Sequence, residues 1–329
     1  MNSKIEKVEE LLKDKKVAIA FSGGSDSTLL CYLAKKVSAD VLAITVNNNL
    51  FNSSFCNNCK EIAKKLKVRH IILEEDFYKY PEIIKNDSNR CYLCRNKMYS
   101  CIINKAEEEG FDLIIDGNNI SDLVLNRPGI IVNYEKNITS PFIEAGLESF
   151  EIKKFLNENN INYSKSTTCL ATRFKGKITK EKILEIDELE NIVYENSKCE
   201  IVKIKKNNED HVCEVDDITK FDDKVLFKLI TDSLNKKKDS KVHLNIRNIK
   251  NNDSITIDEN QNVFRYQLPY KIDIRKTKFE LENRIAKSND SEIMLKDNIL
   301  ITEKGLITSQ NMLKKEEFIK VLVKIRRKL

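Results

Sequence analysis

The chain has 329 residues, of which 33% are charged and 41% are hydrophobic, the composition of an ordinary soluble protein. This length suits two domains, with one large and one small as the expected division. Basic residues outnumber acidic ones by only 57 to 51, and the net charge of +6 is too small to predict nucleic-acid binding by itself. The positive balance does suit an anionic small substrate such as a nucleotide.

No part of the sequence resembles a secretion signal or a membrane span. Residues 1–16 are charged throughout, and no apolar run approaches the ~18 residues that a spanning helix needs. We therefore expect a cytoplasmic protein that does not bind membranes. In that reducing compartment, nine cysteines are more typical of metal binding or catalysis than of a disulfide framework.

Predicted strands and helices alternate along the chain as far as about residue 170. This order predicts an α/β fold, with a doubly wound parallel sheet that carries helices on both faces. The predicted strands are 17–21, 40–46, 69–73 and 113–116, and the predicted helices are 28–34, 55–66, 91–109, 148–159 and 179–195.

The character of the sequence changes beyond Asn196. Short β-like runs separated by polar turns replace the long alternating segments, and a basic helix is expected over 314–327. We therefore expect two domains, 1–175 and a smaller α+β domain 176–329, which diverges after about residue 197. The β-like runs are 199–205, 211–215, 242–246 and 254–257.

The first predicted strand leads directly into Ser22-Gly23-Gly24-Ser25-Asp26-Ser27, and a predicted helix follows at once. A strand, a Gly/Ser turn and a helix in this order form an anion site, because free backbone amides and the positive helix end point at one spot. Glycine allows close approach of phosphate oxygens, the serine hydroxyls donate to them, and the aspartate suits Mg²⁺.

This hexapeptide lacks the lysine of G-x-x-x-x-G-K-[ST] and does not match G-x-G-x-x-G. It resembles the PP-loop, S-G-G-x-D-S, of enzymes that split ATP into AMP and pyrophosphate. An ordinary glycine turn capped by serine is the simpler alternative. Six matched positions in a strand-to-helix context favour the PP-loop.

Three cysteines in two places form a second signal. Cys91 and Cys94 make a C-x-x-C at the start of a predicted helix and are flanked by Arg90 and Arg95, whereas Cys169 lies among small, polar and basic residues. Positive neighbours favour the thiolate, which is the nucleophile and the metal ligand. Packing of the first pair as small hydrophobic side chains is the alternative.

Seven motifs that occur in a fixed order resemble the LarE family of ATP-dependent sulfur transferases, within the PP-loop superfamily. The resemblance extends from about residue 15 to about residue 195, and it is much weaker beyond about residue 197. The motifs are Ser22 to Ser27, Arg90-Cys91-Tyr92-x-Cys94, Asp116-Gly117-Asn118, Asp122-Leu123, Arg127-Pro128-Gly129, Ser140-Pro141-Phe142 and Cys169-Leu170-Ala171-Thr172-Arg173.

The resemblance implies a PP-loop ATP-pyrophosphatase domain at 1–175 and a substrate and oligomerisation domain at 176–329. ATP would adenylate a carboxylate of a small anionic substrate, similar to a pyridinium mononucleotide, and sulfur would displace AMP to give a thiocarboxylate. In the family this reaction belongs to nickel-pincer cofactor biosynthesis. The implied cofactors are ATP and Mg²⁺, and the implied partners are a sulfide or persulfide donor and further copies of the chain, with no nucleic acid expected.

The resemblance also assigns roles to individual residues. Asp26, Cys169 and Arg173 would act in catalysis, with Asp26 near Mg²⁺. Arg127 and Arg173 would hold the carboxylate or phosphate of the substrate through bidentate contacts. The remaining residues would contact ATP, the loop at its pyrophosphate and the others at the neighbouring strand ends: Ser22, Gly23, Gly24, Ser27, Thr45, Gly117 and Asn118.

Two sources of sulfur occur in the family. In one, a lone cysteine at the position of Cys169 gives up its own sulfur and becomes dehydroalanine. In the other, three cysteines hold a [4Fe–4S] cluster whose fourth iron carries an extra sulfide. The presence of Cys91 and Cys94 beside Cys169 favours the cluster, because three thiolates leave one iron open. A sacrificial Cys169 remains the alternative.

The sequence leaves three further points open. Cys56 and Cys59 form a second C-x-x-C, for which we favour packing over a persulfide relay or a second metal site. A tRNA thiolation enzyme is the main rival function, although no RNA-binding motif is visible. An ammonia-using amide synthetase gives no reason for three placed thiols, and a non-catalytic nucleotide sensor would release no pyrophosphate.

Overall fold

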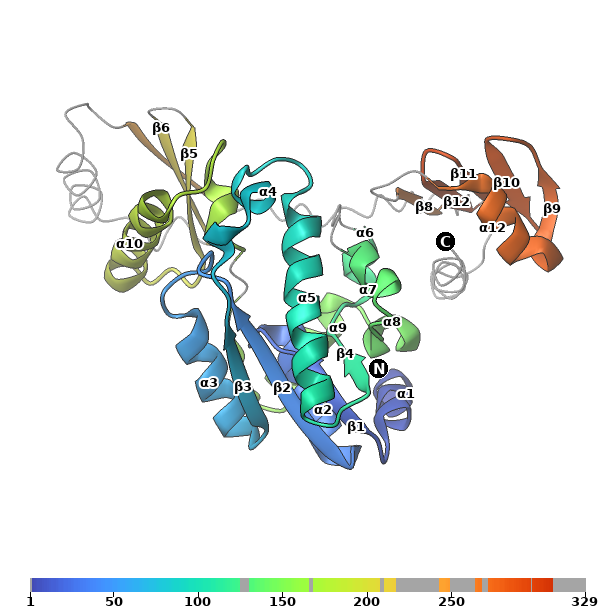
Figure 1. Cartoon of the computed structure of the whole chain (residues 1–329), viewed down its shortest axis with the longest axis horizontal. Helices are drawn as coiled ribbons and strands as arrows, with labels where there is room; N and C mark the ends of the chain where they lie inside the picture. Colours follow the sequence, from blue (N-terminus) through green and yellow to red (C-terminus); the bar gives the residue numbers. More distant parts are fainter. Residues whose placement is uncertain are drawn as a thin grey trace.

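The computed structural model describes residues 2–124, 130–165, 168–207, 210–216, 243–248, 264–267, 272–296 and 298–309. A parallel sheet of four strands, in the order β3-β2-β1-β4, lies at the centre of the N-terminal half (Figure 1). The predicted parallel sheet is thereby confirmed. Its strands are β1 (Lys16–Ala20), β2 (Asp40–Asn47), β3 (Arg69–Glu74) and β4 (Leu113–Ile115).

Helices cover both faces of this sheet. Successive side chains of a strand point to opposite faces, so Val17 and Ile19 pack in one hydrophobic cluster while Ala18 packs in another. The first cluster holds side chains of α1 (Asn2–Leu12), α2 (Ser25–Val37), α3 (Phe55–Leu66), α8 (Pro141–Ala145) and α9 (Ser149–Glu158), and the second holds those of α5 (Arg90–Glu108) and α7 (Ile131–Glu135).

Helix α1 was not predicted from the sequence, because charged residues occur throughout it. Ile5, Val8 and Leu12 nevertheless recur at helical spacing and are buried in the first cluster. The four helices predicted at 28–34, 55–66, 91–109 and 148–159 are confirmed as α2, α3, α5 and α9, with ends that differ by a few residues.

A second structural unit follows the sheet and packs against its loops. It contains a 3₁₀ turn, η3 (Leu170–Arg173), the predicted helix α10 (Lys180–Asn196) and a sheet in the order β5-β6-β7. Leu50, Phe77 and Ile83, which follow β2 and β3, share a hydrophobic cluster with this unit. The strands are β5 (Val202–Asn207), β6 (Asp210–Val215) and β7 (His243–Asn248), with β5 and β6 antiparallel and β6 and β7 parallel.

The hydrophobic cluster of this unit includes residues on both sides of the predicted boundary between residues 175 and 176. By packing, η3 therefore belongs with α10 and β5. The division into 1–175 and 176–329 stays a prediction. Short connecting helices complete the N-terminal half: η1 (Phe77–Lys79), α4 (Pro81–Ile84) and α6 (Ile120–Val124).

The C-terminal region forms an antiparallel sheet in the order β8-β12-β11-β10-β9, apart from the central sheet (Figure 1). The predicted strand 254–257 and helix 314–327 lie outside the described residues. In the part of the chain that is described, no helix is both long and apolar enough to cross a membrane. The elements are β8 (Phe264–Gln267), α12 (Ile274–Leu281), η5 (Glu282–Arg284), β9 (Ile285–Ser288), β10 (Glu292–Leu295), β11 (Ile299–Thr302) and β12 (Leu306–Ser309).

Candidate nucleotide and sulfur site

The predicted PP-loop connects β1 to α2 and presents the amino end of a 13-residue helix. Gly23 has a φ of +69°, which glycine adopts without the steric cost of a Cβ atom. A Cβ at Gly23 would also come within 3.2 Å of Cδ1 of Ile62. The first amides of a helix have no acceptor within it and carry its positive partial charge, so this end of α2 suits an anion.

Hydroxyl groups brace the loop from inside. The backbone N–H of Ser22 donates to Oγ of Ser27 over 3.2 Å, and Oγ of Ser27 lies 3.3 Å from the carbonyl oxygen of Gly24, to which it donates. The hydroxyl of the buried Thr28 donates to the carbonyl oxygen of Gly23 over 3.1 Å. These bonds connect Ser22, Gly23 and Gly24 to the first turn of α2.

Gly117 lies directly against the amino end of α2. A Cβ there would stand 2.9 Å from both the carbonyl carbon of Asp26 and the backbone nitrogen of Ser27. Only glycine allows so close an approach of two backbone segments. The structure thus brings Gly117 and the loop together, as the sequence predicts for neighbouring strand ends.

Asp116 is the centre of a buried hydrogen-bond network beside this loop. Its carboxylate accepts from Arg95 Nη2 over 2.7 Å, from Asn118 Nδ2 over 2.8 Å and from Asn133 Nδ2 over 2.7 Å. Burial raises the pKa of Tyr99 well above its ordinary value, so the phenol stays protonated and also donates to Asp116. Asn118 therefore holds the loop after β4 in position.

Three members of this network, Asp116, Asn118 and Ser140, belong to motifs of the sequence. Ser140, which also donates to Asp116 over 2.7 Å, begins the motif Ser140-Pro141-Phe142. The position of Ser140 in a motif could have identified it as a residue of the site. The sequence associated Arg95 with the thiolates of Cys91 and Cys94, whereas the structure pairs it with Asp116. Tyr99 and Asn133 carried no signal, because only folding brings α5 and α7 next to β4.

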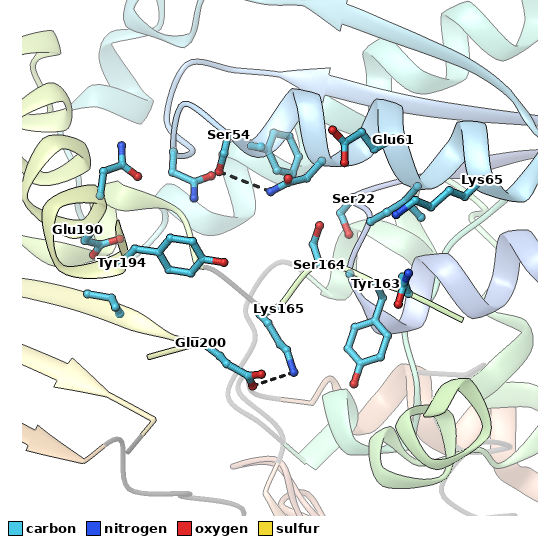
Figure 2. Close-up of a pocket in the computed structure, with 18 residues that line it drawn as sticks. Ser22, Ser54, Glu61, Lys65, Tyr163, Ser164, Lys165, Glu190, Tyr194 and Glu200 are labelled. Atoms are coloured by element: carbon cyan, nitrogen blue, oxygen red, sulfur yellow. Dashed lines mark hydrogen bonds and ion pairs between the residues drawn. The ribbon is translucent and has the colours of Figure 1, made fainter. Parts of the chain in front are cut away.

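A cavity of about 500 Å³ opens in front of the loop (Figure 2). Ser22 and Gly24 form part of its wall, and the other contributions come from α3, the segment 162–165, α10 and the start of β5. This volume lies within the usual range for small-molecule sites. Both sides of the cavity carry polar groups, among them Asn58 and Lys65 from α3 and Tyr194 from α10.

Thr45 lies inside the sheet. Its side chain is buried, its hydroxyl donates to the carbonyl oxygen of Phe21 over 2.8 Å, and it is 2.8 Å from Nε2 of His70. Burial lowers the pKa of His70, which keeps that imidazole neutral. The hydroxyl of Thr45 therefore links β2 to its neighbours, and the expected proximity of Thr45 to adenosine stays a prediction.

The structure brings the three predicted cysteines together around Arg90. Cys91 and Cys94 lie in the first two turns of α5, and Cys169 immediately precedes η3. The buried Arg90 donates to the carbonyl oxygen of Ala171 over 2.8 Å and to Sγ of Cys91 over 3.3 Å. Arg90 thereby ties the start of α5 to the turn that follows Cys169.

Burial dominates the pKa of two of these thiols, Cys94 and Cys169. It raises the pKa of Cys94 to about 12, and the nearby charge of Cys169 acts in the same direction. Burial also raises the pKa of Cys169, whereas the positive charge of Arg90 opposes that rise. The two thiols are therefore protonated at neutral pH unless a metal or another electrophile replaces the proton.

These side chains have the chemistry of an iron–sulfur site, since three thiols gather beside one cation. Throughout the described residues, no three His, Cys, Asp or Glu side chains are arranged to hold a metal ion. The three thiols therefore match an iron–sulfur cluster in ligand type but not in arrangement, and the cluster stays a prediction.

Arg173 is buried and holds the Cys169 loop. Its Nε donates to Glu190 Oε1 over 2.6 Å, and its Nη1 donates to the hydroxyls of Thr168 and Thr172 over 2.6 and 2.8 Å. The side chain of Arg173 is only 1% exposed. This geometry suits a positioning role for Arg173, and the substrate contact expected from the sequence stays a prediction. Arg127 lies outside the described residues.

The second C-x-x-C packs under the PP-loop. Cys59 is fully buried, and its Sγ would lie 3.5 Å from a Cβ at Gly23. Burial raises the pKa of Cys59 to about 12 and also raises the pKa of the half-buried Cys56. The full burial of Cys59 against the loop favours the packing interpretation.

Comparison with known proteins identifies the class to which this site belongs. Residues 1–126 match the PP-loop domain family. An uncharacterized protein of Methanocaldococcus jannaschii is 34% identical over 188 residues, which cover 56% of this chain and 72% of that protein. The chain therefore belongs to the PP-loop family, as its first loop predicts.

Two of the relatives have names that state an enzymatic activity. The pyridinium-3,5-bisthiocarboxylic acid mononucleotide synthase of Lactiplantibacillus plantarum is 27% identical over 50% of this chain and 61% of its own length. The tRNA-5-methyluridine(54) 2-sulfurtransferase of Pyrococcus horikoshii is 31% identical over 36% of this chain and 39% of its own length. The first match confirms the resemblance to the LarE family that the motifs carry.

Proposed function

We propose that the protein is an ATP-dependent sulfurtransferase that forms AMP and pyrophosphate and converts a carboxylate of a small anionic substrate into a thiocarboxylate. One observation carries this proposal. The backbone N–H of Ser164 donates to the carbonyl oxygen of Gly23 over 2.8 Å, and Cys169 follows five residues later beside Arg90. A single short segment therefore links the phosphate loop to the thiols.

The first step takes place at the amino end of α2. The substrate carboxylate attacks the α-phosphorus of ATP, and the bond to pyrophosphate breaks with its electron pair going to pyrophosphate. The backbone amides of the loop and the hydroxyls of Ser22 and Ser27 would bind the phosphate oxygens. Asp26, partly exposed in the first turn of α2, would supply a carboxylate oxygen to Mg²⁺, which would also bind the phosphates.

The second step transfers sulfur. A sulfur nucleophile attacks the acyl carbon, and AMP leaves with the electrons of the carbon–oxygen bond. Cys91, Cys94 and Cys169 would hold a [4Fe–4S] cluster, which supplies a bound sulfide to the reaction when it is present. Arg90 would place its positive charge beside this anionic sulfur, and Arg173 would keep the loop of Cys169 in position.

The alternative source of sulfur is Cys169 itself. After Cys169 Sγ has attacked the acyl carbon, the bond between Cβ and Sγ would break with loss of the Cα proton and leave dehydroalanine. That reaction needs neither Cys91 nor Cys94. The two sources therefore differ in which single variants abolish sulfur transfer.

Anaerobic reconstitution with iron and sulfide tests the source of sulfur. We expect about four iron atoms per chain in the wild type, and loss of that iron in Cys91→Ala, Cys94→Ala and Cys169→Ala. Cys101→Ala, which removes another half-buried thiol of α5, is the matched control and should retain the iron. Loss of the mass of hydrogen sulfide from Cys169 during turnover, in protein without iron, would establish the sacrificial route.

The two candidate reactions differ in the molecule that accepts the sulfur. The relative from Lactiplantibacillus is named for a mononucleotide product, and the relative from Pyrococcus is named for tRNA. We favour the small anionic substrate because the match to the Lactiplantibacillus relative extends over 50% of this chain, compared with 36% for the Pyrococcus relative. Release of pyrophosphate with pyridinium mononucleotides tests this choice, and a salt-sensitive gel shift with tRNA would favour the rival.

A further inference from the structure

An ion pair connects two chain segments that line the cavity in front of the PP-loop (Figure 2). Lys165 Nζ lies 2.9 Å from Glu200 Oε2, and both residues line the cavity together with Ser22 and Gly24. Lys165 comes from the segment that leads to Cys169, whereas Glu200 comes from the residues just before β5. The pair therefore joins the loop side of the cavity to the β5 side.

The backbone of Lys165 is anchored to the phosphate loop. Its neighbour Ser164 donates its N–H to the carbonyl oxygen of Gly23 and forms a parallel bridge with Gly24. The Cα of Lys165 is thus fixed one residue away from the loop that would hold the phosphates. A lysine ammonium on a flexible stem is a common phosphate ligand, because it acts as a mobile point charge.

Glu200 is anchored independently on the other side. Oδ1 of Asp216 accepts from the N–H of Glu200 over 2.9 Å and from the N–H of Ile201 over 3.0 Å. Glu200 therefore keeps its place at the start of β5 whether or not Lys165 contacts it. The ammonium can leave this carboxylate without unfolding either segment.

Lys165 can exchange the carboxylate of Glu200 for another anion because both side chains are exposed. The side chains of Lys165 and Glu200 are 46% and 56% exposed, and ion pairs as exposed as this contribute little to stability. A triphosphate presents several negative charges to the same ammonium, and hydrogen bonds between ionised groups are among the strong ones. Phosphate would therefore displace the single carboxylate.

We propose that Lys165 binds the β- and γ-phosphates of the nucleotide and that Glu200 holds the ammonium when no nucleotide is bound. This inference rests on the proposed function, since it takes ATP as the ligand of the cavity. Glu200 then lowers the affinity for ATP, because it competes with phosphate for one cation. Loss of Lys165 and loss of the Glu200 charge must consequently have opposite effects on binding.

Isothermal titration of ATP and AMP into the full chain tests this exchange. We expect Lys165→Gln to weaken ATP binding about tenfold and Glu200→Gln to tighten it about two- to threefold, since one removes a charged hydrogen bond and the other its competitor. AMP lacks the β- and γ-phosphates, so both substitutions should change its affinity less than twofold.

A pair of similar exposure on α9 provides the control. Lys154 and Glu158 are 61% and 52% exposed and line no part of the cavity. Lys154→Gln and Glu158→Gln make the same changes in net charge as the two test variants, and each should leave ATP affinity unchanged. Unfolding temperatures without nucleotide verify that all four variants are folded.

The outcomes separate the inference from the function on which it rests. If the wild type binds neither ATP nor AMP, the proposed function fails together with the inference. If the wild type binds ATP but Glu200→Gln leaves its affinity unchanged or weakens it, the exchange is wrong and the pair is a structural brace. An unchanged affinity in Lys165→Gln would overturn the phosphate contact itself.

Discussion

Replacing Gly117 by alanine tests how closely the loop after β4 approaches the amino end of α2. The added Cβ would lie 2.9 Å from the backbone of Asp26 and of Ser27, a distance that real Cβ atoms do not show, and backbone atoms cannot rotate away. Overpacking of this kind costs about 1–3 kcal/mol. In a domain of this size, the corresponding fall in unfolding temperature is roughly 2–12 °C.

The displaced backbone belongs to the predicted phosphate site, so Gly117→Ala should also weaken ATP binding at temperatures where the variant is folded. Gly24→Ala in the same loop is the matched control for stability alone, because its Cβ would meet only Oγ of Ser22 at an ordinary 3.5 Å. Thermal unfolding and titration of ATP measure the two effects. Wild-type stability together with wild-type affinity in Gly117→Ala would refute the close approach.

Three further predictions concern the sulfur side of the site. Arg173→Gln should destabilise the protein by about 3–5 kcal/mol because Glu190 is left as a buried unpaired charge, and urea unfolding of Arg173→Gln with and without Glu190→Gln should show partial recovery in the double variant. In metal-free protein, burial raises the pKa of Cys94 from 9.0 to about 12, so the native state retains a proton that the unfolded chain releases above pH 9. The free energy of unfolding should therefore fall as pH rises from 9 to 12, and Cys94→Ala should lessen this slope by up to about 1.4 kcal/mol per pH unit. Arg90→Lys should lose the bond to the turn after Cys169, and faster alkylation of Cys169 would report the loosened loop, whereas an unchanged rate would argue against this role.

The central fold could be predicted from the sequence because its strands are buried on both faces. In β2 six consecutive residues, Val41 to Val46, are buried, and a continuous apolar run of this length is typical of a strand in a covered parallel sheet. Helix α1 escaped prediction because its three buried apolar residues are separated by charged ones. The strands of the C-terminal sheet were not predicted either. In β10, β11 and β12 burial alternates along four residues, so none of them forms a continuous buried run like that of β2.

The candidate site likewise contains some residues that the sequence identified and others that only the structure placed there. A lysine and a glutamate such as Lys165 and Glu200 carry no motif, and their 2.9 Å contact depends on how β5 packs beside the segment before Cys169. Arg173 does belong to a motif, but the motif could not show that the guanidinium is buried against Glu190. A motif identifies a residue type, whereas burial decides whether its charge is available to a ligand.

The sequence by itself determined the phosphate loop, because the backbone conformation of Ser22 to Ser27 follows from local residues and from the strand and helix on either side. It also identified the cysteine positions. Only the tertiary structure decided that Cys91, Cys94 and Cys169 meet around Arg90 and that Asp116 joins β4 to α5 and α7. Those contacts join residues far apart in the chain, and long-range packing alone sets their distances and their burial.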